Sequence, residues 1–144
     1  QGTGFDAPVY SIAIQPDGKI LVGGEFNDYN GSVVYCLVRL NTNGSIDTSF
    51  SSPSSIDSSV NTIQVLSNGN ILIGGLFTIY NGQQANRIVM LNSDGSINNG
   101  WSVGSGFDNT VFNISQQVNG IVSVVGQFTT VNGQSYPLIV KLTT

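Results

Sequence analysis

The chain has 144 residues, a formal net charge of −4 and no histidine, and only 8% of its residues are charged, against roughly 25% in an average soluble domain. Its four basic side chains, Lys19, Arg39, Arg87 and Lys141, are too few and too scattered for nucleic-acid binding or for attraction to an anionic membrane. The absence of histidine excludes a Ser-His-Asp triad, a Cys-His dyad and metal ligation by imidazole.

The first 51 residues consist of short expected strands separated by turns. Residues 9–15 alternate apolar and polar side chains, and residues 20–24 form an apolar run typical of a strand buried on both faces. The other expected strands are 33–40 and 45–50, and the expected turns are 16–18, 29–31 and 41–44. No segment keeps the 3.6-residue period over the length of a helix, so the sequence predicts an all-β protein.

A single spacing of 51 residues runs through the whole chain without a gap. The aligned columns include Asp6, Asp57 and Asp108; Gly24, Gly75 and Gly126; Phe26, Phe77 and Phe128; and Asn30, Asn81 and Asn132. We therefore expect one domain, residues 1–144, built from the repeats 1–51, 52–102 and 103–144. The third repeat is the shortest, and it lacks the counterpart of the last expected strand.

Four strands per repeat is the pattern of a β-propeller blade. We therefore expect three tandem four-stranded repeats of 51 residues that form propeller-like blades, with a three-fold β-trefoil as the alternative. Propellers typically have about four to eight blades, so three blades alone leave open faces or edges. A second copy could complete a six-bladed ring, a longer polypeptide could supply further blades, or the repeats could close as a trefoil.

Glycines and aromatic residues predict how the repeats pack. The second glycine of the pair Gly23-Gly24 recurs as Gly75 and Gly126, although the first is replaced by Val125 in the third repeat. Glycine inside a strand marks a bulge or the close approach of another backbone, so we expect the second glycine to be a structural requirement. The aromatic residues expected to fill the space between neighbouring repeats are Phe26, Phe77, Phe128, Phe50 and Trp101.

Residues 15–26, QPDGKILVGGEF, followed by Tyr29-Asn30-Gly31, resemble the delta-60 repeat family. The resemblance extends through residues 39–41, 43–47 and Phe50, and the lead-in Gly4-Phe5-Asp6 returns at 106–108. It covers essentially the whole chain and departs from the pattern at Val125, Val131 and Thr143. The resemblance implies a propeller-like β-repeat of the kind found in large secreted bacterial proteins and some phage-associated proteins. It supplies no catalytic residues.

Polar and aromatic residues that recur with the repeat are the candidate ligand or assembly positions. Asp6, Asp57 and Asp108 could converge on one axis as a cation or sugar site, or each could cap a turn through its own backbone. Aromatic rings and amides suit the faces and hydroxyls of a sugar, although the same residues could simply pack and shape turns. The positions of this second kind are Tyr29, Tyr80, Asn30, Asn81 and Asn132.

Composition and repetition favour a non-catalytic structural or interaction module, an extracellular or virion-surface assembly protein, with a carbohydrate-binding propeller or trefoil lectin as the alternative. We do not expect an enzyme, a cofactor or a metal site, because Glu25 is the only glutamate and the sequence contains no phosphate loop and no EF-hand-like run. The expected partners are other copies of the chain, neighbouring segments of a larger protein, and glycans. No apolar run reaches the length of a membrane helix, and Cys36 is expected to be a buried small hydrophobe.

Overall fold

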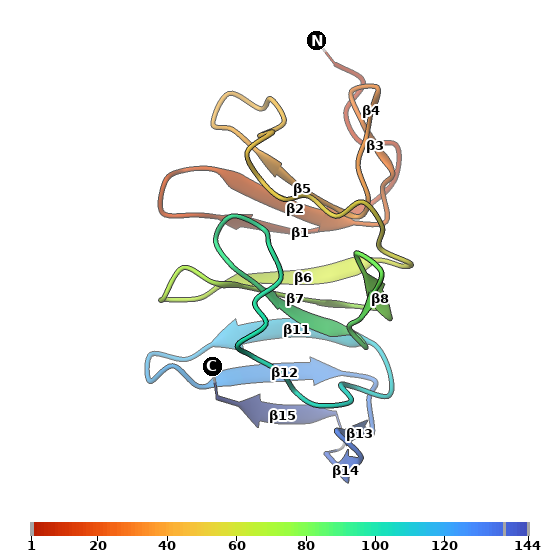
Figure 1. Cartoon of the computed structure of the whole chain (residues 1–144), viewed down its shortest axis with the longest axis vertical. Helices are drawn as coiled ribbons and strands as arrows, with labels where there is room; N and C mark the ends of the chain where they lie inside the picture. The colour runs from red at the N-terminus through yellow and green to blue at the C-terminus, as the bar shows by residue number, and fades with distance from the viewer. Residues whose placement is uncertain (1, 137, 144) are drawn as a thin grey trace.

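The computed structural model describes residues 2–136 and 138–143, which form strands and turns (Figure 1). Three three-stranded antiparallel sheets follow one another along the chain. The first contains β1 (Val9–Ile14), β2 (Ile20–Gly24) and β5 (Leu37–Leu40); the second, β6 (Val60–Val65), β7 (Ile71–Gly75) and β10 (Ile88–Leu91); the third, β11 (Val111–Gln116), β12 (Val122–Gly126) and β15 (Ile139–Leu142). In each sheet the strand that comes second in sequence lies in the middle.

In each repeat, a short hairpin with two-residue strands lies between the second long strand and the last one. The Asn-Gly pairs form the turns of these hairpins, and Asn30 takes a φ of 54°, in the left-handed region that such a turn requires. The hairpin strands are β3 (Asp28–Tyr29) with β4 (Ser32–Val33), β8 (Ile79–Tyr80) with β9 (Gln83–Gln84), and β13 (Thr130–Val131) with β14 (Gln134–Ser135).

Two expected strands differ from the structure. The strand expected at 33–40 is divided into β4 and β5, because Cys36 adopts a φ of 57° and breaks the extended backbone between them. The strand expected at 45–50 is reduced to a single β-bridge between Leu40 and Ile46. Beyond that bridge the side chain of Asp47 accepts hydrogen bonds from the amide and hydroxyl of Ser49, and this local turn ends the strand pairing.

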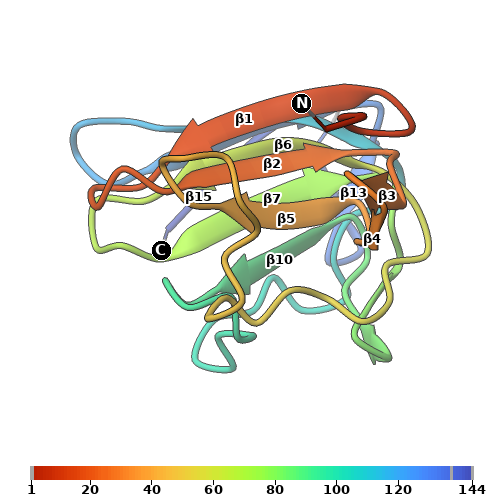
Figure 2. The ribbon, with the colours of Figure 1, turned by 90° about the horizontal axis from the view of Figure 1, so that it is seen from above.

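The three sheets stack in chain order, with the second sheet between the first and the third (Figures 1 and 2). The first strands of the three repeats, β1, β6 and β11, lie next to one another across the stack. The fold is therefore all-β and made of propeller-like blades, as the sequence predicts, although each sheet has three strands where four strands per repeat were expected. The open stack differs from a β-trefoil, whose repeats would close on themselves.

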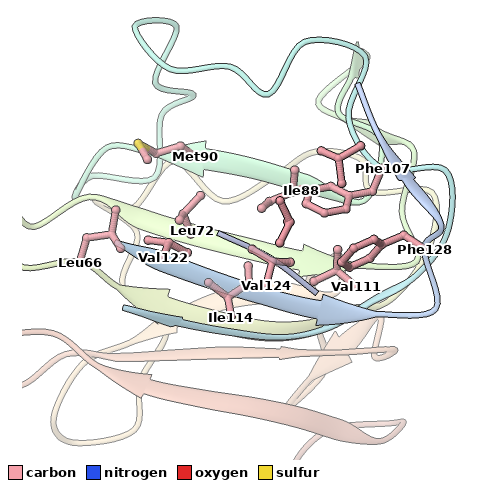
Figure 3. Close-up of a cluster of buried hydrophobic side chains, with 12 residues drawn as sticks. Leu66, Leu72, Ile88, Met90, Phe107, Val111, Ile114, Val122, Val124 and Phe128 are labelled. Carbon is pink, nitrogen blue, oxygen red and sulfur yellow. The ribbon is translucent and has the colours of Figure 1, made fainter. Parts of the chain in front are cut away.

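Apolar side chains fill both spaces between the sheets. Figure 3 shows the space between the second and third sheets, where Leu72 and Ile88 meet Ile114 and Val124. The rings of Phe26, Phe77 and Phe128 are all fully buried. Phe77 belongs to the apolar cluster between the first and second sheets, and Phe128 belongs to the cluster between the second and third sheets.

The second glycine of each central strand faces a β-bulge. The register between the first and second strands of each sheet shifts by one residue, at 9–11, 60–62 and 111–113. The bulge brings a backbone carbonyl against the glycine, so that a Cβ on Gly75 would lie 2.1 Å from the oxygen of Ser59. The same clash would occur at Gly24 and Gly126, at 2.2 and 2.1 Å. Close backbone approach therefore explains why this glycine recurs in every repeat.

Candidate interaction surfaces

The three repeated aspartates each bind the hairpin of their own repeat. One carboxylate oxygen accepts two consecutive backbone amides in every copy, as in an end-capping turn. The donors are Asn27 and Asp28 to Asp6, Thr78 and Ile79 to Asp57, and Thr129 and Thr130 to Asp108. The Thr129 hydroxyl, together with the backbone amides, lowers the pKa of Asp108 to about 2. Each carboxylate is thus committed to local hydrogen bonds that favour its ionised form.

The repeated asparagines join each hairpin to the segment that leads into the repeat. Asn30, Asn81 and Asn132 all have a positive φ, between 50° and 54°. The side-chain oxygen of Asn81 accepts hydrogen bonds from the amide and hydroxyl of Ser54. Asn30 accepts the Gly4 amide and Asn132 accepts the Ser105 amide in the same way. These amides hold the turn and its lead-in together.

The two tyrosines of the hairpins have different surroundings. The Tyr29 hydroxyl donates to the carbonyl oxygen of Gly44 at 2.9 Å, and its ring packs against Phe5. Tyr80 is fully buried, and its hydroxyl has no hydrogen-bond partner among the described residues. Burial raises the pKa of Tyr80 above its usual range. The Tyr80 ring is therefore core, and it offers no face to a sugar.

This contrast gives a matched pair of stability predictions. Tyr80→Phe is expected to raise the free energy of unfolding by about 1 kcal/mol, because it removes a buried hydroxyl that lacks a partner. Tyr29→Phe is expected to lower it by about 1 kcal/mol, because a hydrogen bond to Gly44 is lost. Urea unfolding of both variants measures the difference, and equal losses in the two would contradict this assignment.

The first sheet presents an open apolar face, which we call the outer face of the first sheet and define by Val9, Ile12 and Ile14. These side chains are 37%, 63% and 68% exposed. Ile63 and Ile114 occupy the position of Ile12 in the next two repeats, where they are 7% and 3% exposed. The difference arises because a preceding sheet covers the second and third sheets on this side (Figure 1).

A shallow hollow of about 430 Å³ crosses the three repeats at their bulges. The extra residue of each bulge lies at or near it, and two of these residues, Tyr10 and Phe112, are 48% and 50% exposed. A hydrogen bond to Glu25 raises the pKa of Tyr10. Sequence reasoning did not single out these residues, because the bulge that turns them outward is not visible in the alternation of the strand.

Within residues 2–136 and 138–143, no group of three histidine, cysteine, aspartate or glutamate side chains is placed to hold a metal ion. No helix long and apolar enough to cross a bilayer occurs in the same part of the chain. Cys36 is buried as a free thiol, and burial raises its pKa to about 11. At neutral pH this thiol is therefore protonated and weakly nucleophilic.

Residues 15–50 and 66–100 match the model of a family described as a domain of unknown function (DUF5122) beta-propeller. The two matched segments begin 51 residues apart, at the spacing of the internal repeat. Among curated proteins and solved structures, none matches the chain. The family match and the repeated sheets together indicate a propeller-like repeat protein, a type of domain that suggests a structural or interaction module.

Proposed function

We propose that this β-propeller-like repeat protein is a non-catalytic assembly module and that it binds its partner through the outer face of the first sheet. The exposure of Ile12 carries this proposal, because its counterparts Ile63 and Ile114 are buried by a neighbouring sheet. Contiguous exposed apolar side chains mark interaction surfaces. The chain itself contains two examples of the contact that would cover this face.

The setting we propose is an extracellular or virion-surface assembly, with other copies of the chain or neighbouring segments of a larger protein as partners. A charged fraction of 8% and a polar surface of uncharged side chains support a scaffold. Non-catalytic function is supported by the recurring aspartates, whose carboxylates are used in hairpin hydrogen bonds. Acid–base catalysis would need a free carboxylate or a histidine poised toward a substrate.

The proposal predicts association that depends on Ile12. Light scattering across a dilution series should show a mass that rises above 15.2 kDa with concentration for the wild type. Ile12→Asn should remain at 15.2 kDa throughout, because an amide on the open face removes apolar contact area and demands hydration. Val33→Asn is the matched control, because Val33 is 69% exposed on the hairpin strand β4, outside this face.

A wild-type mass that stays at 15.2 kDa, or an association that Ile12→Asn leaves intact, would argue against this surface. The second candidate function is glycan binding, which the exposed Tyr10 and Phe112 rings beside the bulge hollow favour. Binding on a glycan array that Ile12→Asn does not change would support this second function in place of assembly.

A further inference from the structure

The two contacts between sheets share one feature: side chains of the following sheet pack directly on a glycine of the preceding sheet. The side chains of Val60 and Ile63 pack on Gly23, where a Cβ would lie 2.7 Å from Cγ1 of Val60 and 3.1 Å from Cδ1 of Ile63. In the next contact a Cβ on Gly74 would lie 2.6 Å from Cγ1 of Val111. A sheet can therefore receive a neighbour in this geometry only where its central strand has no side chain at this position.

The third sheet carries side chains that do not fit the same contact. Its outer face consists of the residues that occupy the receiving columns, namely Ser123, Val125, Ile139 and Lys141. Val125 stands in the column of Gly23 and Gly74, and Ser123 stands where the earlier sheets have the fully buried Leu21 and Leu72. Lys141 is exposed in the column of Arg39 and Met90, both of which are buried.

The hydrogen bonds between sheets also distinguish the first two sheets from the third. The Ser11 hydroxyl accepts the amide of Ile63, and the Thr62 hydroxyl accepts the amide of Ile114. Asn113 holds this column in the third sheet, and its side-chain oxygen already accepts the Ile114 amide and the Thr62 hydroxyl. The side chain of Asn113 therefore bonds to its own sheet and to the preceding one, whereas the hydroxyls of Ser11 and Thr62 bind a backbone amide of the following sheet.

We propose that the two outer faces have opposite roles. In preference to a second copy of itself, the outer face of the first sheet docks a blade of this repeat type with glycine at the Gly23 position and apolar side chains beside it. The outer face of the third sheet is a cap that refuses such a blade, because of Val125, Ser123 and Lys141. Ser123 and Lys141 make this face partly polar, and a polar outer face on a terminal repeat limits growth in repeat proteins. Assembly is then directional: wild-type copies do not join head to tail, and the concentration-dependent association of the wild type pairs two first-sheet faces.

This inference rests on the proposed function, and a mixing experiment separates the two. The acceptor is Ile12→Asn/Val125→Gly. It cannot dock through its own first sheet, but its third sheet has the glycine that the first two sheets carry at this position. The control acceptor is Ile12→Asn alone, and the donor is the wild type. Labelled acceptor or control acceptor is titrated with donor and followed by fluorescence anisotropy. We expect the acceptor to bind the wild-type donor at least tenfold more tightly than the control acceptor does. A donor that carries Ile12→Asn should not bind the acceptor.

A second acceptor copies the second sheet further, with Ser123→Leu and Lys141→Met added, and should bind more tightly again. Equal binding by acceptor and control acceptor would overturn the cap. If this occurred while wild-type association still depended on Ile12, the inference would fail and the proposed function would stand.

The reverse substitution tests the same device inside the chain, independently of the folding of the acceptor. Gly74→Val should lower the melting temperature, because the new side chain meets Val111 and Ile114 in the contact with the third sheet. An unchanged melting temperature would show that valine is compatible with the contact and would also overturn the proposal.

Discussion

Arg39→Ala is expected to lower the free energy of unfolding by about 3 kcal/mol, because it breaks a buried ion pair. Arg39 and Asp47 are only 5% and 6% exposed, and the guanidinium Nε lies 2.7 Å from a carboxylate oxygen of Asp47. Another guanidinium nitrogen donates to Gln15 and to the carbonyl oxygen of Ser93. Because Ser93 belongs to the second repeat, this side chain joins the first two repeats of the stack.

The expected loss lies at the lower end for a broken buried pair because Lys19 also binds Asp47, at 2.8 Å. Alanine would still leave the Gln15 amide oxygen without this donor, and the Ser93 carbonyl would keep only the hydrogen bond from Gln15 Nε2, at 3.3 Å. It would also remove the guanidinium from the Phe50 ring, whose centroid lies 4.6 Å away. Lost packing of the long arginine stem adds to the cost.

The second repeat shows how the same space is filled without charge. Leu66, Met90 and Asn98 occupy the columns of Gln15, Arg39 and Asp47, and Leu66 and Met90 are 3% exposed. We therefore expect Gln15→Leu/Arg39→Met/Asp47→Asn to be as stable as the wild type, since apolar replacements of buried ion pairs are often neutral or stabilising.

Chemical denaturation of the wild type, Arg39→Ala and the triple variant measures these differences. The pH dependence provides a separate readout. The hydrogen bond from Lys19, followed by those from Ser49 and Arg39, holds the pKa of Asp47 well below its usual range. Its contribution to stability is therefore present above the unfolded pKa, about 3.9, and is lost as the pH falls below that value. The triple variant should lack this loss, and a triple variant as unstable as Arg39→Ala would contradict the argument.

Local patterns predicted most of the long strands, because alternation and turn residues act over a few positions. The strand expected at 45–50 failed because Asp47 forms side-chain hydrogen bonds to Ser49 that compete with strand pairing. The strand expected at 33–40 failed at Cys36, where no glycine or asparagine marks the positive φ. Both differences arise where a nonlocal or side-chain interaction overrides the apolar pattern.

The interaction surface was harder to predict than the fold. Residues of the Asp6 and Asn30 columns recur because they fix hairpins, and a repeat spacing alone does not separate such a role from ligand binding. Ile12 and Ile63 are the same residue at the same repeat position, and their different exposure depends on whether a sheet precedes them. The one sequence feature that points to a difference between the sheet faces is Val125, which replaces a glycine found in the first two repeats.

Gly75→Ala is expected to lower the free energy of unfolding by about 3 kcal/mol, because its Cβ would lie 2.1 Å from the Ser59 carbonyl oxygen. That oxygen also accepts the amide of Leu76, so relief of the clash must pull apart the bulge and its hydrogen bond. The clashing atom is backbone, which cannot turn away as a side chain can.

Gly82→Ala is the matched control, because a Cβ there meets no atom within 4 Å and the cost comes from a φ of 74°. We expect that change to cost about 1 kcal/mol, the penalty of a left-handed backbone for a residue with a side chain. Urea unfolding of both variants decides whether close approach governs the glycine column. If Gly75→Ala cost no more than Gly82→Ala, the bulge would be soft, and Gly24 and Gly126 would need another explanation. A large difference would instead show that the bulge fixes the central strand of each sheet, and with it the spacing at which Gly23 and Gly74 receive the following sheet.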